Sequence, residues 1–139
     1  TKNGTMSCEV IVIFNKKIKE DFERRQKRAG HLWSKNRYMS AQIIKWIEND
    51  RWIKAAKKAN NNAQSIKNIL TKNEHIIIEY PVDINMVFAR IPKAIQEKLH
   101  NFNVSFNPWY GNDNLTRFVS SWDTKDSEIK QLENIVTNL

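Results

Sequence analysis

Residue types that commonly hold metal ions or act as nucleophiles are few and scattered along this chain. The three histidines, His31, His75 and His100, stand apart, and no second histidine or acidic residue lies at ligand spacing from His31. This spacing argues against a metal site. The one cysteine, Cys8, cannot form an internal disulfide, and the apolar residues after it indicate an inert thiol in or near a core. A lone free thiol is typical of the reducing cytoplasm.

Basic side chains are abundant, since the formal net charge is +8 at pH 7. Clustered lysines and arginines can bind nucleic-acid phosphates through counterion release. The densest cluster lies on one expected helix, where interleaved acidic residues can neutralise part of it. Its basic members are Lys16, Lys17, Lys19, Arg24, Arg25, Lys27 and Arg28. The tryptophans do not alternate with basic residues as they do in single-strand binders. A stand-alone basic module that binds acidic partners or nucleic acid stays the alternative function.

Length and composition favour one folded domain. The chain has 139 residues, 40% hydrophobic and 27% charged, with only three glycines and three prolines, which is ordinary globular usage. No apolar run approaches the roughly 20 residues that span a bilayer, and the start has no signal-peptide pattern. Because the sequence opens at Thr1 without an initiator Met, we expect it to be a piece of a longer protein.

The first half of the chain predicts one strand and three helices. Residues 8–14 are short, β-branched and apolar, which indicates a strand covered on both faces, after a turn at Thr1–Gly4. Helices are expected at about 16–29, ending at Gly30, and at about 34–49, capped by Ser34. The third, 50–70, carries a stripe of small residues. Its members are Ala55, Ala56, Ala59, Ala63, Ile66 and Leu70.

The second half predicts a small sheet with two helices. Alternating residues indicate strands at 75–80 and 84–90, and two further strands are expected near 104–106 and 116–122, around a loop at 108–114. Pro92 suits the first turn of a short helix, 93–100. A last helix begins at about Lys125, capped by Asp123 or Thr124. Its inward residues are expected to be Ile129, Leu132, Ile135, Val136 and Leu139.

These elements predict an α+β fold, in which a small antiparallel sheet packs with helices. The strand at 8–14 has no parallel companion in the chain. We therefore expect it to be the last strand of a larger sheet that lies upstream.

Three motifs resemble a known family. They are Thr1-Lys2-Asn3-Gly4, the run 27–35 (KRAGHLWSK) and the run 117–124 (RFVSSWDT), with 85–92 (NMVFARIP) between them. In this order and spacing, the chain resembles the carboxyl-terminal portion of low-specificity L-threonine aldolases, in the aromatic amino acid β-eliminating lyase and threonine aldolase family of fold-type I pyridoxal-phosphate enzymes. The resemblance covers essentially the whole chain. It implies that residues 1–33 end the large cofactor domain and that 34–139 form the small domain.

The resemblance gives roles to single residues. Lys2 matches the lysine that binds pyridoxal phosphate as a Schiff base, which needs an unprotonated amine. Arg117 matches the arginine that binds the substrate α-carboxylate, for which a planar fork of donors is suited. The alternatives are a hydrated terminal Lys2 and an edge-strand Arg117 that pairs with Asp123 or Asp113.

Three basic residues near the ends of the first two helices also match the cofactor and substrate region of the family. By resemblance Lys27 and Arg28 approach the substrate, and Arg37 reaches the cofactor phosphate of a neighbouring subunit, although helical residues of this kind are often only exposed. The residues that grip the phosphate and pair with the ring nitrogen are expected upstream.

The resemblance implies a pyridoxal-phosphate-dependent lyase of amino acid metabolism. The whole protein is expected to cleave β-hydroxy-α-amino acids, such as threonine to glycine and acetaldehyde, as a cytoplasmic homo-oligomer, either a dimer or a tetramer. The isolated 139 residues are expected to be inactive and free of cofactor.

Overall fold

The computed structural model describes residues 4–6 and 8–139, except for the side chains at 112 and 113. The chain forms two compact units, residues 1–52 and residues 53–139. The expected domain boundary near residue 33 stays a prediction. Among the described residues, no helix is long and apolar enough to cross a membrane.

The first unit is built from helices α1 (Lys16–Arg28) and α2 (Asn36–Ile47) and the short turn η1 (Glu48–Asp50). Asn15 caps α1 by accepting a hydrogen bond from the backbone N–H of Lys17 at 3.0 Å. Gly30 follows the helix with a φ of 76°, and this left-handed residue ends α1 where the sequence predicts. The predicted cap of α2 is wrong, because its N-cap is Lys35 and no side chain caps it.

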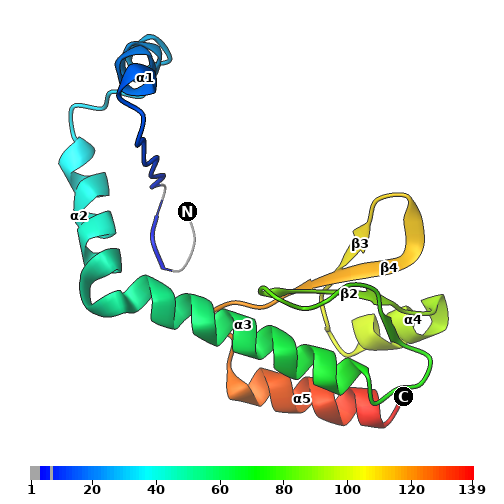
Figure 1. Cartoon of the computed structure of the whole chain (residues 1–139). Helices are drawn as coiled ribbons and strands as arrows, with labels where there is room; N and C mark the ends of the chain where they lie inside the picture. The colour runs from blue at the N-terminus through cyan, green and yellow to red at the C-terminus, as the bar shows by residue number, and fades with distance from the viewer. Residues whose placement is uncertain (1–3, 7) are drawn as a thin grey trace. The chain divides into compact units, whose positions relative to one another are not determined.

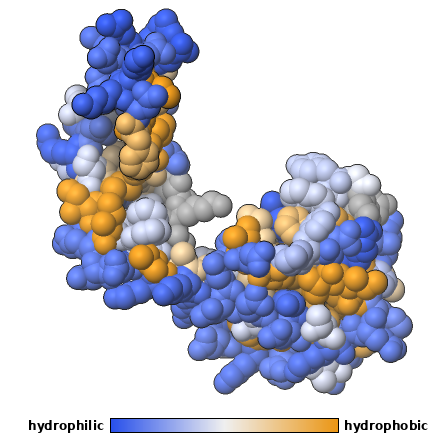
Figure 2. All heavy atoms as spheres, viewed as in Figure 1, coloured by the Kyte–Doolittle hydropathy of each residue, from blue (hydrophilic) through white to orange (hydrophobic). Residues whose placement is uncertain are grey.

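Residues 8–14 of the first unit are not a strand, which corrects the prediction of a buried one. Cys8 is buried, but Val12 is 68% exposed and Phe14 is 93% exposed. Hydrophobic residues accordingly appear at the surface of this unit in Figure 2. A strand is buried only when neighbouring strands satisfy its backbone and cover its faces, and the described part of the chain supplies none here.

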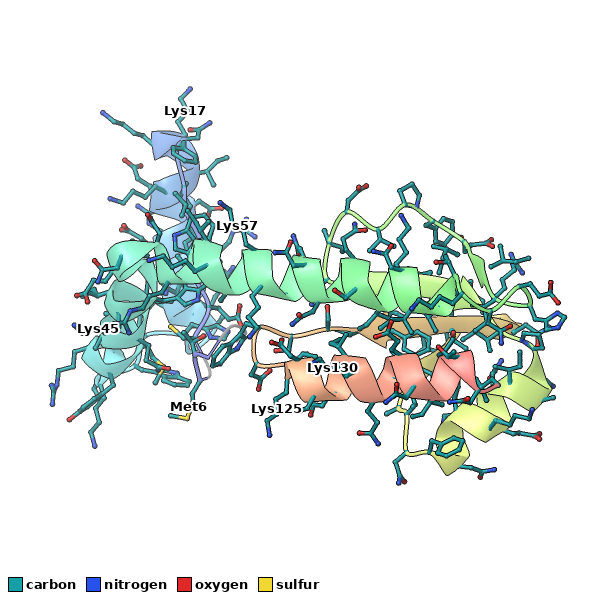
Figure 3. The ribbon with its side chains drawn as sticks, turned by 90° about the horizontal axis from the view of Figure 1, so that it is seen from below. Met6, Lys17, Lys45, Lys57, Lys125 and Lys130 are labelled. Atoms are coloured by element: carbon teal, nitrogen blue, oxygen red, sulfur yellow. The ribbon has the colours of Figure 1, made fainter. Side chains whose placement is uncertain are left out.

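The second unit is a four-stranded antiparallel sheet with helices, so the α+β prediction is confirmed. Helix α3 (Arg51–Leu70) lies beside α5 (Asp126–Thr137) in both Figure 1 and Figure 3. The strands follow the order β1-β2-β4-β3. Their bounds are β1 Ile77–Ile78, β2 Met86–Arg90, β3 Asn107–Trp109 and β4 Asn112–Val119, and α4 (Lys93–Asn101) follows β2.

The hairpin formed by β3 and β4 departs from the sequence prediction. The strand expected at 104–106 lies at Asn107–Trp109 instead, and most of the expected loop at 108–114 is paired. The strands connect through Tyr110 and Gly111, whose φ of 79° suits a tight turn. A register shift between Pro108 and Trp109 marks a bulge.

The core lies between the sheet and the two helices α3 and α5. Val87 and Ala89 of β2 and Phe118 of β4 point toward them and are buried. The helices contribute Ala63, Ile66, Ile69, Leu70, Leu132 and Val136 to the same cluster. Burying one such large side chain, as at Leu70, stabilises the fold by about 1.5–3 kcal/mol. The other face of β2 and β4 is called the open face below, and it carries Met86, Phe88, Arg90, Leu115, Arg117 and Val119.

Ser120 fixes the end of β4 against α3. Its hydroxyl lies 2.7 Å from the carbonyl oxygen of Ala59 and donates to it, and its side chain is almost fully buried. One turn further along α3, the amide of Asn62 donates to the carbonyl of Ser121 at 3.0 Å. These bonds satisfy buried polar groups and set the position of the strand that carries Arg117.

Candidate functional site: an unpaired arginine on the open face

Arg117 lies in the middle of β4, which is an inner strand of the sheet. It is opposite Phe88 of β2 and opposite Asn107 of β3. Because side chains of cross-strand partners share a face, Arg117 and Phe88 both lie on the open face. Strands on both sides fix the backbone of Arg117, and its side chain is half-buried.

The guanidinium of Arg117 has no carboxylate partner in the described part of the chain. Its Nε is buried and has no hydrogen-bond partner among those residues. An unpaired buried donor costs about 1–3 kcal/mol, so the group is poised to bind an acceptor from outside. The alternative pairing with Asp123 is not among the ion pairs of the described residues, and the side chain of Asp113 lies outside those residues.

Arg90, the second arginine of the open face, does have a carboxylate partner. Its Nε and a terminal nitrogen donate to the two carboxylate oxygens of Glu79, each at 2.5 Å. The hydrogen bond from Arg90 and its positive charge hold the pKa of Glu79 below its ordinary value, against the opposing effect of desolvation. Glu79 fills one edge of the Arg90 guanidinium and balances its charge, whereas no such partner among the described residues balances the charge of Arg117.

One aromatic ring contacts Arg117, and two further rings pack in series behind it. The guanidinium carbon lies over the ring of Trp109, 5.3 Å from its centroid. Phe88 meets Trp109 edge to face at 5.1 Å between centroids, and Tyr80 meets Phe88 in the same manner at 5.6 Å. Sequence reasoning gave these rings no role, because it placed Trp109 in a loop. The signal that could have found it is Gly111, a turn residue that stands shortly before the strand-forming run from Leu115 to Val119.

The other predicted site residues belong to the first unit or are not described. Lys2 lies outside the described residues. Lys27 and Arg28 are exposed in the last turn of α1. Arg37 is exposed near the start of α2, with its guanidinium 4.9 Å from the ring centroid of Tyr38 and a 3.5 Å hydrogen bond to that hydroxyl. The structure therefore does not group these residues with Arg117 in one unit.

An open hollow in the first unit is lined by Cys8, Ile13, Phe22, His31 and Met39, with further residues around it. Lys27, Arg28 and Arg37 are not among its lining residues. The thiol of Cys8 donates to the carbonyl of Met39 at 3.3 Å. Among the described residues, no group of three or more His, Cys, Asp or Glu side chains could hold a metal ion.

The basic surface of α1 is partly neutralised within the helix. Asp21 pairs with Arg25 at 2.6 Å and Glu23 pairs with Lys19 at 3.8 Å, both at spacing i,i+4. Lys17 projects away from the helix (Figure 3). Such exposed pairs contribute little to stability. They leave α1 a basic surface of mixed charge rather than an uninterrupted basic stripe.

Comparison with known proteins agrees with the resemblance found in the motifs. No family model matches the chain. Two curated proteins named low specificity L-threonine aldolase, from a Pseudomonas species and from Pseudomonas aeruginosa, align with 132 residues, 95% of the chain, at 35% and 32% identity. The chain spans 38% of the length of each relative.

A solved structure of a threonine aldolase from Leishmania major shares the fold. Its TM-score is 0.61 over 72% of this chain and 30% of that chain, at 16% identity. The predicted resemblance to low-specificity threonine aldolases is therefore confirmed, and so is the fold of their small domain. The chain is similar to part of such an enzyme.

Proposed function

We propose that this chain is the carboxyl-terminal part of a pyridoxal-phosphate-dependent lyase that cleaves β-hydroxy-α-amino acids, and that the complete protein converts threonine to glycine and acetaldehyde. The observation that carries the proposal is Arg117, whose buried Nε has no hydrogen-bond partner among the described residues, on the open face of a fold shared with a threonine aldolase. Because the chain spans 38% of its relatives, we propose that the 139 residues alone are inactive.

The donor groups of the chain fit an amino acid substrate and a phosphorylated cofactor. Arg117 offers a planar fork of N–H donors, which binds a carboxylate through two parallel hydrogen bonds. Arg37 is exposed and contacts Tyr38, so most of its donors are open to an anion such as a phosphate. When bound, pyridoxal phosphate supplies a conjugated ring that takes up the electron pair left at Cα when the bond from Cα to Cβ breaks.

Each predicted residue has one role in this proposal. Lys2 holds the cofactor covalently, and Arg117 fixes the α-carboxylate of the substrate. A fixed carboxylate decides which bond at Cα stands perpendicular to the cofactor ring, and therefore which bond breaks. Lys27 and Arg28 approach the substrate, and Arg37 reaches the phosphate of a neighbouring subunit.

The last role requires a homo-oligomer, which we propose as the working form, whether dimer or tetramer. The cytoplasm is the proposed compartment. Its support is that the single cysteine, Cys8, requires no oxidising environment.

The proposal is tested at Arg117 in the complete protein that contains this chain. The change Arg117→Gln removes the planar fork but keeps a side chain of similar reach. Hydrogen bonds to a charged group contribute about 1.5–3 kcal/mol, so KM for threonine should rise roughly 10- to 100-fold. Arg117→Lys, which keeps the charge without the fork, should recover only part of the loss.

Arg24→Gln is the matched control, because Arg24 is exposed on α1. This substitution should leave the KM for threonine unchanged. Steady-state kinetics of acetaldehyde release gives KM and kcat for each variant. The proposal fails if Arg117→Gln protein keeps the KM and kcat of the unmodified enzyme.

A further inference from the structure

We propose that Trp109 is a positioning residue that holds the Arg117 guanidinium in the orientation that binds a carboxylate, without neutralising its charge. The inference rests on the proposed function and adds to it a residue that acts through Arg117. Its starting observation is the position of the guanidinium carbon over the indole ring, 5.3 Å from the centroid.

The reason lies in how a flexible cation can be oriented. An arginine side chain has many rotamers, and fixing one of them before the ligand arrives removes an entropic cost from binding. A carboxylate partner would fix the side chain too, but it would occupy the donors, as Glu79 does at Arg90. An aromatic face attracts the cation through its quadrupole and leaves the N–H groups, which lie in the guanidinium plane, open to a ligand.

The ring of Trp109 is itself held in place. Phe88 packs against it edge to face, with an interplanar angle of 85°. Phe88 is also the cross-strand partner of Arg117, so the same two strands carry the cation and the support of its ring. Tyr80 packs against Phe88 in turn, at an interplanar angle of 77°. The three rings form a series that begins at Tyr80 and ends under the guanidinium.

The Nε of Arg117 is buried, and the indole of Trp109, which lies against the guanidinium, is expected to cover part of it. A carboxylate from outside therefore meets the terminal nitrogens first, while Trp109 holds the guanidinium in place.

The first test uses the 139-residue chain and the Nε–H resonance of Arg117 in proton–nitrogen NMR spectra, with acetate as the carboxylate probe. The ring current of Trp109 should shift this resonance upfield, and burial should slow its exchange with water. Trp109→Ala should abolish the upfield shift, speed exchange and weaken the affinity for acetate about 3- to 10-fold, the ratio expected for one cation–π contact. Trp109→Phe should restore part of each effect.

Trp122→Ala is the matched control, because Trp122 is similarly exposed at 41% and has no ring contact with Arg117 among the described residues. It should leave the Arg117 resonance and the acetate affinity unchanged. The inference is overturned if Trp109→Ala protein, folded by its other resonances, keeps the shift and the affinity. If Trp109→Ala protein does not fold, Trp109→Phe and Trp109→Leu test the inference instead. Only Trp109→Phe, which keeps an aromatic ring, should retain the upfield shift of the Arg117 resonance and the affinity for acetate.

The second test separates this inference from the proposed function. In the complete protein, Trp109→Ala should raise KM for threonine about 3- to 10-fold with little change in kcat. If Arg117→Gln raises KM and Trp109→Ala does not, the positioning role is wrong and the proposed function stands. If Trp109→Ala alters the Arg117 resonance as expected but Arg117→Gln leaves KM unchanged, the proposed function is wrong.

Discussion

Arginine side chains on one face of a sheet can differ completely in what they offer a ligand. The difference between Arg90 and Arg117 comes from a single neighbour, Glu79, which follows β1 and reaches Arg90 on the adjacent strand. Sequence reasoning selected Arg117 by resemblance alone. The sequence did not reveal that Arg90 is paired with Glu79, because residues 79 and 90 are brought together only by the pairing of β1 with β2.

The ion pair between Glu79 and Arg90 predicts a pH dependence of stability. Since pairing lowers the pKa of Glu79 in the native state, its contribution is fully present above the unfolded-state value of about 4.3. It is lost as the pH falls through the lower native value. Glu79→Gln should therefore destabilise the chain at pH 7, and the difference from the unmodified chain should be smaller at pH 3 than at pH 7.

Urea unfolding at the two pH values measures this difference. Glu97→Gln is the control, because Glu97 is exposed on α4 and should change stability little at either pH. An equal destabilisation by Glu79→Gln at pH 7 and pH 3 would show that the carboxylate charge is not what stabilises the pair.

At the scale of elements, the sequence predicted helices better than the hairpin. Periodicity placed Ala59, Ala63, Ile66 and Leu70 on the inner face of α3, and all four are buried. It did not identify Asn62, whose burial depends on a hydrogen bond to Ser121 across 59 residues of sequence. A helical stripe is a local property of the chain, whereas such a bond is known only from the tertiary structure.

The hairpin was missed for a similar reason. Pro108 disfavours a strand in isolation, so residues 108–114 read as a loop. In the structure β3 is an edge strand with a bulge next to this proline. Edge strands and bulges are the places where a sheet tolerates a proline. The error hid Trp109, and with it the aromatic half of the candidate site.

The small residues on the inner face of α3 leave little room for larger side chains between this helix and the sheet. Ala63 is fully buried beneath the sheet, so Ala63→Leu should force its neighbours apart and lower the free energy of unfolding by about 1–3 kcal/mol. Ala94→Leu on exposed α4 adds the same atoms and should change stability by less than about 0.5 kcal/mol. Thermal or urea unfolding of the two variants makes the comparison, and equal effects would contradict close packing at Ala63.

At the scale of the whole molecule, the two units differ in how much core they contain. The main cluster of buried hydrophobic side chains belongs to residues 53–139. Helices α1 and α2 contain no buried residue, and Cys8 is the buried residue among those described in the first unit. Stability that comes from burial is therefore concentrated in the second unit.

This imbalance predicts unequal hydrogen exchange. Backbone amides of α3 from Ala59 to Leu70, and those of β2 and β4, should exchange on the order of 100-fold more slowly than amides of α1 and α2. Mass spectrometry of deuterium uptake after digestion resolves these segments. Comparable protection in α1 and in α3 would mean that the first unit is held by interactions that burial does not reveal.

Residues 9–14, with the sequence EVIVIF, have a consequence for handling the chain by itself. An exposed run of β-branched and aromatic residues without proline and with one charge is the kind of segment that stacks between molecules into cross-β fibrils. Lys16 and Lys17 follow it after Asn15, and the lysines of neighbouring copies repel one another when the copies align in register. At high salt that repulsion is screened, so preparations of the isolated chain are safest from fibril formation at low ionic strength and low concentration.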